Sequence, residues 1–316
     1  MIRFLTRRVA ELLATLLIAS FLIFASVQIA PGRPETFLLG GRAASPEALA
    51  AIRERYHLGD PFFAQYAHWL SGTLHGDLGI SIQYRSDVTS LIASRLPVTL
   101  ELLALSTVLV VVVGVTLGTL GAVRRGPVDT AVGVATSAAV ATPSFVAAIA
   151  LLSVFSVRLG WFPTLGAGDG ALDTLWHLVL PAIALALPFI GVISSVTRAS
   201  IIEQAALDHT TVARARGVPE RVIVRRHLLR GALGVIITQS GLAVANLVIS
   251  TVLVEYAFGL GGLGDLLAKS VTIKDFPVVQ AVSLLIIALF IGVNAVIDLI
   301  HPLVDPRTTL GTRSTA

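Results

Sequence analysis

Residues 98–123 read VTLELLALSTVLVVVVGVTLGTLGAV, and Glu101 is the only charged residue among them. A helix needs about 20 mostly apolar residues to cross the hydrocarbon core of a bilayer. The stretch is therefore typical of a membrane-spanning helix. We expect another helix to pack closely on one side of it, because Gly114-x-x-x-Gly118 leaves room for a neighbour.

Five further stretches are as long and as apolar, which predicts six membrane-spanning helices in all. They cover residues 9–30, 131–157, 174–196, 232–256 and 278–300. The first could also be a signal peptide, but its apolar core exceeds the usual ~7–15 residues, so an uncleaved anchor is predicted. Pro181 and Pro188 are expected to interrupt the fourth span, where neighbouring helices can satisfy the freed carbonyl groups.

The composition of the chain excludes a water-soluble globule. Hydrophobic residues make up 55% of the chain and charged residues only 13%, which leaves too little polar surface to cover a soluble fold. There is no cysteine, so disulfide bonds, thiolate metal sites and thiol nucleophiles are excluded as well. The net charge of +4 is typical of cytoplasmic loops beside anionic lipid, and no nucleic-acid partner is predicted.

The distribution of basic residues predicts how the chain crosses the membrane. If the N-terminus is inside, the short outside loops contain only Arg158, Lys269 and Lys274. The inside segments then contain fourteen arginines, which are Arg3, Arg7, Arg8, Arg124, Arg125, Arg198, Arg214, Arg216, Arg221, Arg225, Arg226, Arg230, Arg307 and Arg313. Positive residues concentrate on the cytoplasmic side, so a multi-pass protein of the cell membrane with both termini in the cytoplasm is predicted.

Residues 31–94, between the first two predicted spans, differ from the rest of the chain. They mix acidic, basic and aromatic side chains with turn sequences, and Ser45-Pro46 is typical of a helix start. We therefore predict a small folded extracellular insertion here. The other predicted segments are a cytoplasmic tip with the first span at 1–30, a membrane core at 95–302 and a cytoplasmic tail at 303–316.

The inside loop at residues 198–230 is the most informative segment, and it holds seven of the fourteen inside arginines. Asp208 can cap a short helix, and its charge suits the positive end of the helix dipole. Gly217 can take the left-handed conformation that ends a helix, and Pro219 prevents continuation. A short, capped helix among arginines suits either a rigid contact for a protein partner or a basic segment lying on anionic lipid.

The order and spacing of several motifs resemble the B-type permease subunits of bacterial ABC importers for dipeptides, oligopeptides and nickel, over nearly the whole chain. In the loop the motifs are Asp208 with Ala213-Arg-Ala-Arg-Gly217, and Arg226-His-Leu-Leu-Arg-Gly-Ala-Leu233. Elsewhere they are Pro31-Gly-Arg-Pro34, His75-Gly-Asp-Leu-Gly-Ile-Ser81, Arg95-Leu-Pro97-Val-Thr-Leu-Glu-Leu102, Arg125-Gly126 with Asp129, Pro277-Val-Val-Gln280 and Asp305-Pro-Arg307.

The chain departs from this family's pattern at four positions. His209 stands in place of an aromatic residue, Thr211 of an arginine, Gly231 of an asparagine and Val235 of a proline. Without the proline, the fifth span is expected to be straighter at its start. His209 leaves open how the short helix fits its partner.

The resemblance implies an all-α integral membrane protein with six transmembrane helices, the fold of type I ABC importer permeases. It also implies a heterodimer with a homologous second permease, two ATPase subunits docked inside and a substrate-binding protein outside. Coupling to the ATPase subunits is assigned on this basis to Asp208, Ala213, Arg214, Ala215, Arg216 and Gly217. The implied cargo is a peptide, and a nickel chelate or a glutathione-like substrate is the alternative.

The chain is accordingly predicted to be a transport subunit and not an enzyme, with no catalytic residue and no cofactor of its own. It lacks the Gly-x-x-x-x-Gly-Lys-Ser/Thr phosphate loop, so ATP and Mg²⁺ are expected on the partner ATPase subunits. A self-sufficient secondary transporter is less favoured, because no internal repeat is evident. An intramembrane hydrolase is disfavoured by the absence of a Gly-x-Ser-x-Gly elbow and of an aspartate pair within the spans.

Three further predictions concern individual segments. Gln239 and Asn246 lie deep in the fifth span, where they either line the pathway or bond to a neighbouring helix. No metal site is predicted, because the spacings of His57, His68 and His75 match no compact ligand motif. For the insertion, docking of the binding protein and mere stabilisation of the helices both remain open.

Overall fold

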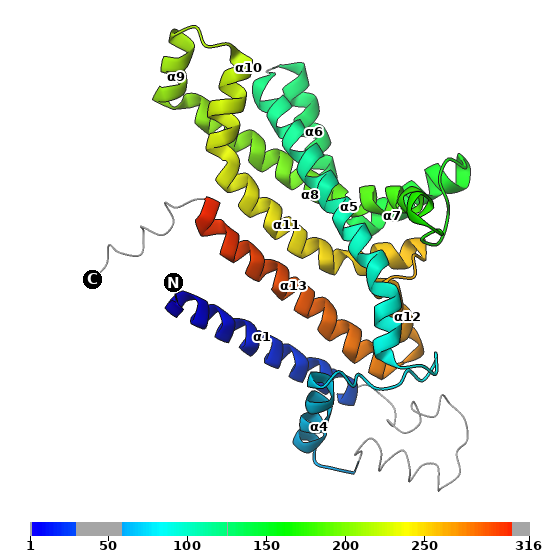
Figure 1. The fold of residues 1–316 in the computed structure, drawn as a ribbon. Helices are drawn as coiled ribbons and strands as arrows, with labels where there is room; N and C mark the ends of the chain where they lie inside the picture. The colour runs from blue at the N-terminus through cyan, green and yellow to red at the C-terminus, as the bar shows by residue number, and fades with distance from the viewer. Residues whose placement is uncertain (1, 30–58, 125, 305–316) are drawn as a thin grey trace. The chain divides into compact units, whose positions relative to one another are not determined.

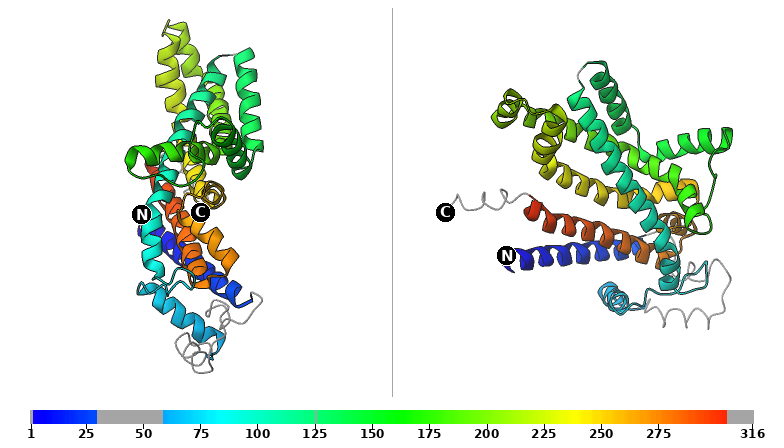
Figure 2. Two further views of the ribbon diagram at one scale, coloured as in Figure 1. Left: turned by 90° about the vertical axis from the view of Figure 1, so that its right-hand side faces the viewer. Right: turned by 45° about the horizontal axis from the view of Figure 1, so that its top comes forward.

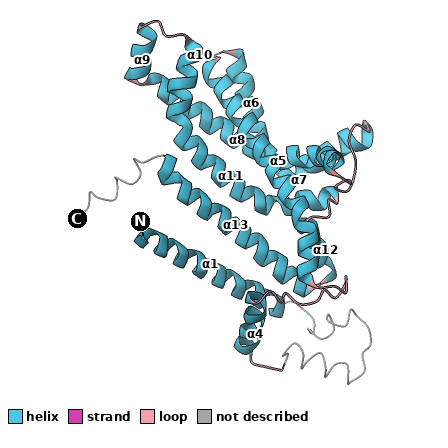
Figure 3. Cartoon of the chain, viewed as in Figure 1, coloured by secondary structure: helices cyan, strands magenta, loops and turns pink. Residues whose placement is uncertain are grey.

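The computed structural model describes residues 2–29, 59–124 and 126–304. Within these ranges the chain consists of helices joined by loops, with one isolated pairing of Ile80 with Asp87 and no strand (Figure 3). Contacts divide it into two compact units. Unit 1 is drawn from Met1–Thr99 and Leu260–Ile291, and unit 2 from Leu100–Gly259 and Gly292–Ala316.

Some sequence predictions fall outside the described residues. They are the helix start at Ser45-Pro46, His57, the motifs at 31–34 and 305–307, Arg125, and the tail from residue 305 onward.

Among the described residues, five helices are long and apolar enough to cross a membrane, at five of the six predicted positions. Their lengths follow from uninterrupted apolar sequence, with charges gathered in the connections. The helices are α1 (Ile2–Ile29), α5 (Val88–Val123), α8 (Ala171–Ala206), α11 (Leu229–Phe258) and α13 (Phe276–Val304).

The third predicted span is not one straight helix. It consists of α6 (Pro127–Ala141) and of α7 (Ser144–Leu151) continued by the π-helical η1 (Leu152–Arg158), and the two parts are bent by 102°. Thr142 at the break is extended, with φ −93° and ψ 112°. The cause is Pro143, whose ring disfavours the helical conformation for the residue before it.

The fourth span, in contrast, is more regular than predicted. Pro181 and Pro188 were expected to interrupt it, yet α8 is helical from Ala171 to Ala206 through both residues. In unit 2, α8 packs against α6, α7 and α11 (Figure 1). Pro181 is buried in this packing. Packing on several sides holds the helix together across the missing hydrogen bonds.

Glycines on α5 allow α8 to approach closely, as the Gly114-x-x-x-Gly118 motif predicts. A Cβ atom on Gly118 would collide with the carbonyl oxygen of Ser194 and would lie 2.7 Å from Cβ of Thr197. A Cβ atom on Gly114 would lie 2.9 Å from Cβ of Ile193. The prediction of close packing at this motif is confirmed.

Unit 1 contains the described part of the predicted insertion. Its helix α4 (Phe62–Leu74) packs on α1 through aromatic rings, and the hydroxyl groups of Ser20 and Tyr66 are 2.8 Å apart. The loop that follows is fixed to the start of α13, because Ser81 Oγ donates a 2.5 Å hydrogen bond to the buried carboxylate of Asp275. Unit 1 also contains the helix α12 (Leu263–Ile273).

Candidate functional site

The predicted short helix of the 198–230 loop is present as α9 (Asp208–Ala215), followed by α10 (Glu220–Ile223) and the π-helical η2 (Val224–Leu228). Figures 1 and 2 show α9 and α10 side by side at one end of unit 2. The chain turns from α8 into α9 through the single extended residue Leu207. Because this connection is so short, α9 is held directly at the end of α8.

The prediction that Asp208 caps α9 is wrong. Leu207 takes the N-cap position with extended backbone angles, and Asp208 is the first helical residue, with no capping hydrogen bond from a side chain. The carboxylate nevertheless lies in the first turn, where it interacts favourably with the positive end of the helix dipole.

The predicted end of α9 at Gly217 is confirmed. Gly217 is left-handed, with φ +77°, and its N–H donates to the carbonyl of Arg214 at 2.9 Å. The N–H of Val218 reaches back to the carbonyl of Ala213 at 3.2 Å. These two bonds form a Schellman motif, which satisfies carbonyl groups that the helix would otherwise leave open. Pro219 then takes the N-cap position of α10.

One face of α9 is buried against its own chain. Thr210 is fully buried, and its Oγ1 donates to the carbonyl of Gln204 at 2.9 Å. Ala213 belongs to an apolar cluster that joins α8, α9, α10 and the start of α11. The other buried members are Ile201, Ile223, Leu228, Ala232 and Ile236. Ala213 therefore holds α9 in place and is not available to a partner.

The other face of α9 is exposed. Its residues are Asp208, His209, Thr211, Val212, Arg214, Ala215 and Arg216, and Gly217 is exposed beside them. The ring of His209 lies near that of His227 in η2, with centroids 6.1 Å apart. Of the six predicted coupling residues, the structure thus presents five on one surface.

Arg214 has a structural partner that sequence reasoning missed. Its Nε and Nη2 donate to the two carboxylate oxygens of Glu220 at 3.3 and 2.9 Å, and its Nη1 donates to the carbonyl of Ala205 at 3.4 Å. The bond to Glu220 raises the pKa of Arg214 above its ordinary value. Arg214 thereby links α8, α9 and α10. The sequence feature that could have indicated this partner is Glu220, an acidic residue directly after Pro219 at the start of the next helix.

The two predicted pathway residues lie on α11, away from α9. Asn246 is exposed and donates from Nδ2 to the carbonyl of Leu242 in its own helix at 2.8 Å. Gln239 is half-buried two turns earlier. Asn246 therefore bonds within its own helix, and not to a neighbouring helix, which was the second of its two predicted roles.

Within the described ranges, no group of three or more His, Asp or Glu side chains could hold a metal ion. His68 lies 3.6 Å from the carboxylate of Asp60, and His75 contacts the carbonyl of Ser71. These two histidines thus have separate partners within the chain.

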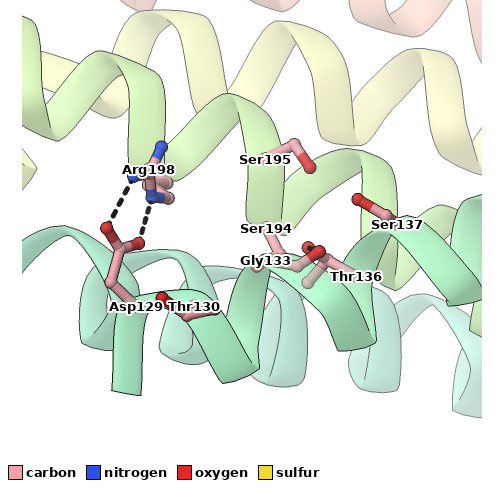
Figure 4. A pocket seen from close by; sticks show the side chains of 8 residues that line it. All are labelled: Asp129, Thr130, Gly133, Thr136, Ser137, Ser194, Ser195 and Arg198. Atoms are coloured by element: carbon pink, nitrogen blue, oxygen red, sulfur yellow. Dashed lines mark hydrogen bonds and ion pairs between the residues drawn. The ribbon is translucent and has the colours of Figure 1, made fainter. Parts of the chain in front are cut away.

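A second polar site, not predicted as a site from the sequence, lies between α6 and α8. It is a hollow of about 360 Å³ lined by Asp129, Thr130, Gly133, Thr136, Ser137, Ser194, Ser195 and Arg198 (Figure 4). Arg198 on α8 donates to both carboxylate oxygens of Asp129 on α6, at 2.6 and 2.8 Å. The two residues are 69 positions apart, so no local pattern in the sequence pairs them.

Comparison with known protein families assigns the chain. Residues 111–310 match the family described as the inner membrane component of binding-protein-dependent transport systems. Residues 1–103 match the family that describes the N-terminal part of such components.

Individual relatives agree with this assignment. A Brucella abortus (strain 2308) protein named as a peptide transport system permease is 37% identical over 305 residues, 95% of this chain and 97% of that one. The glutathione transport system permease GsiC of Escherichia coli (strain K12) is 35% identical over 308 residues, 97% and 98% of the two chains. A chain of the inward-facing MetNI methionine ABC transporter has a similar fold, with a TM-score of 0.57 at 20% identity, over 68% of this chain and 96% of that chain.

Permeases of this kind work with a substrate-binding protein and with ATPase subunits on separate chains, so the chain is a transport subunit and not an enzyme. Its apolar helices make it a multi-pass membrane protein with the all-α fold of type I importer permeases. The chain belongs to the inner-membrane permeases of binding-protein-dependent ABC importers, in the peptide and nickel branch.

Proposed function

We propose that the chain forms half of the pathway of a peptide importer and that separate ATPase subunits drive it through α9. The observation that carries this proposal is the geometry of α9. The helix is fixed at both ends, buries Thr210 and Ala213 on its own chain, and leaves its other face exposed. A short rigid element with one free face suits a contact that transmits force.

Peptide is the proposed cargo because the relatives include permeases named for peptide and for glutathione, itself a small peptide. A nickel chelate stays the alternative. The second permease subunit would be a homologue of this chain, and ATP and Mg²⁺ would bind to the ATPase subunits. The excess of arginine on one side favours a cytoplasmic α9 loop and two cytoplasmic termini.

The connections of α9 explain how a push on it would reach the spans. Leu207 is the single residue between α8 and α9. Arg214 bonds α9 to Glu220 of α10, and α10 continues through η2 into α11. Displacement of α9 would therefore tilt α8 and α11 together. Such tilting would switch the permease between two packed arrangements, in which helices move as rigid bodies with little internal deformation.

A basic helix lying on anionic lipid is the other use of such a segment. A lipid-embedded helix needs an outward apolar face. The exposed face of α9 instead carries Asp208, His209 and Arg216, and Val212, 47% exposed, is its one large apolar side chain. These observations favour a protein partner.

The proposal is tested by Asp208→Ala and Gly217→Pro in the importer reconstituted with its ATPase subunits and binding protein. Proline fixes φ near −65°, whereas Gly217 has φ +77°, so the second change breaks the end of α9. We expect the complex to assemble and to hydrolyse ATP, while peptide uptake per ATP falls several-fold. Asp169→Ala, at an exposed aspartate in another loop, is the matched control and should transport normally. Normal transport by both α9 variants would show that the coupling assignment is wrong.

A further inference from the structure

The hollow between α6 and α8 is unlike the apolar surfaces around it. Five hydroxyl side chains and one ion pair line it, and Figure 4 shows them on the facing sides of the two helices. Val134, Val140 and Val192 are exposed nearby on the same helices. A concentrated polar patch on spanning helices is costly against lipid hydrocarbon, so it is expected to face water or protein.

The hydroxyl groups of the hollow offer mainly hydrogen-bond acceptors. Thr136 Oγ1 donates to the carbonyl of Val132 at 2.9 Å, and Ser195 Oγ donates to that of Gly191 at 2.9 Å. Thr130 Oγ1 donates to the carbonyl of Gly126 at 3.3 Å. Each hydroxyl has one proton and two lone pairs, so once the proton is used within the helix, the lone pairs remain for a ligand.

The ion pair adds a further acceptor and a donor at one end of the hollow. The two hydrogen bonds from Arg198 leave lone pairs free on the carboxylate of Asp129. The Nη1 atom of Arg198 takes no part in these bonds, and the Arg198 side chain is 38% exposed. The hollow therefore offers acceptors along its walls and a guanidinium donor at one end.

We propose that this hollow is a transient binding site for cargo that carries an ammonium group and amide N–H groups, as small peptides do. Hydroxyl and carboxylate oxygens would accept from the ammonium and amide groups, and Arg198 would donate to the peptide's carboxylate. The volume of about 360 Å³ lies at the small end of ligand pockets, which suits a small peptide. This inference rests on the proposed function, because it assumes that α6 and α8 border the path of the cargo.

The absence of native cysteine makes the site testable by thiol labelling. Ser137→Cys and Ser195→Cys are made singly in the assembled importer, and membrane vesicles of both orientations are treated with a charged, water-soluble thiol reagent. Both are expected to react, and the dipeptide Ala-Ala should slow labelling severalfold. Glycerol, which has hydroxyl groups and no N–H, should not protect. Val108→Cys, at an apolar position of α5 that is 56% exposed, is the control expected to stay unlabelled.

Failure to label either hollow position, or labelling that Ala-Ala does not slow, would overturn the inference. Equal protection by glycerol would overturn it too, because the hollow would then lack a preference for N–H donors. ATP-dependent uptake of Ala-Ala by the same vesicles is measured in parallel. Normal uptake without protection counts against the hollow alone, whereas uptake that does not require ATP counts against the proposed function.

Discussion

Thr210 and Thr211 are neighbours in α9 with the same side chain and different surroundings. Thr210 is fully buried and bonds to the carbonyl of Gln204, which anchors α9 to the last turn of α8. Thr211 is exposed, and its long 3.5 Å contact to the carbonyl of Leu207 faces solvent. Substitutions at the two positions therefore measure how much one buried hydrogen bond stabilises the connection between α8 and α9.

Thr210→Val keeps the shape of the side chain and removes this hydrogen bond, so we expect it to destabilise the protein by about 1 kcal/mol. The loss is measured from the midpoint of thermal unfolding of the detergent-solubilised chain, followed by circular dichroism. Thr211→Val, the matched control, should leave the midpoint unchanged. Equal effects of both changes would mean that the bond to Gln204 contributes nothing to stability.

Single residues could be predicted where local chemistry decides their conformation, and not where packing decides it. Gly217 was predicted correctly because a glycine two residues before a proline is a local helix-stop signal. The assignment of Asp208 as the N-cap failed because the cap position depends on the backbone angles of Leu207. The pairing of Asp129 with Arg198 depends on how α6 and α8 pack, which no spacing along the chain reveals.

Among the elements, α5 and α8 depend on glycine for their close approach. Gly118→Ala places a methyl group against the backbone of α8 at Ser194, which cannot move without shifting the helix. We expect a loss of about 1–3 kcal/mol in unfolding free energy, as for other overpacked interiors. The change is measured by urea unfolding in mixed micelles.

Gly292→Ala in α13 is the control for this substitution, because a Cβ atom there meets nothing within 4 Å. It should be neutral or should stabilise by up to about 1 kcal/mol, since alanine favours the helix. If Gly118→Ala were as harmless as Gly292→Ala, the two helices would be less tightly packed than the structure describes.

The six apolar stretches were visible in the sequence because the bilayer imposes a length and an apolarity on each span. The sequence did not reveal where a helix bends, because the effect of a proline depends on the packing around it. Pro143 produces a 102° bend, whereas Pro181 and Pro188 lie inside a continuous α8. Packing of α8 on several sides distinguishes the two cases, and packing is a tertiary property.

At the scale of the whole molecule, the proposed orientation predicts which loops can be labelled from each side. Thr211→Cys in α9 should react with an impermeant thiol reagent only after the cells are permeabilised. Asp169→Cys, in the loop before α8, should react in intact spheroplasts, where the outside of the inner membrane is accessible. The reason is the arginine excess on the α9 side of the membrane. The reverse labelling pattern would contradict cytoplasmic termini.

The π-helical turn η2, at the base of α11, has a consequence for how this permease can change over time. Such a turn completes one rotation with one residue more than an α-helical turn needs. Deleting one residue within Val224–Leu228 would let this segment close as an ordinary α-helix, so α11 would keep nearly the same rotational position relative to α10. A deletion in the regular α-helical part of α11 would instead rotate everything beyond it by about 100°. Single-residue length changes are therefore expected to be tolerated at η2 and not further along the helix.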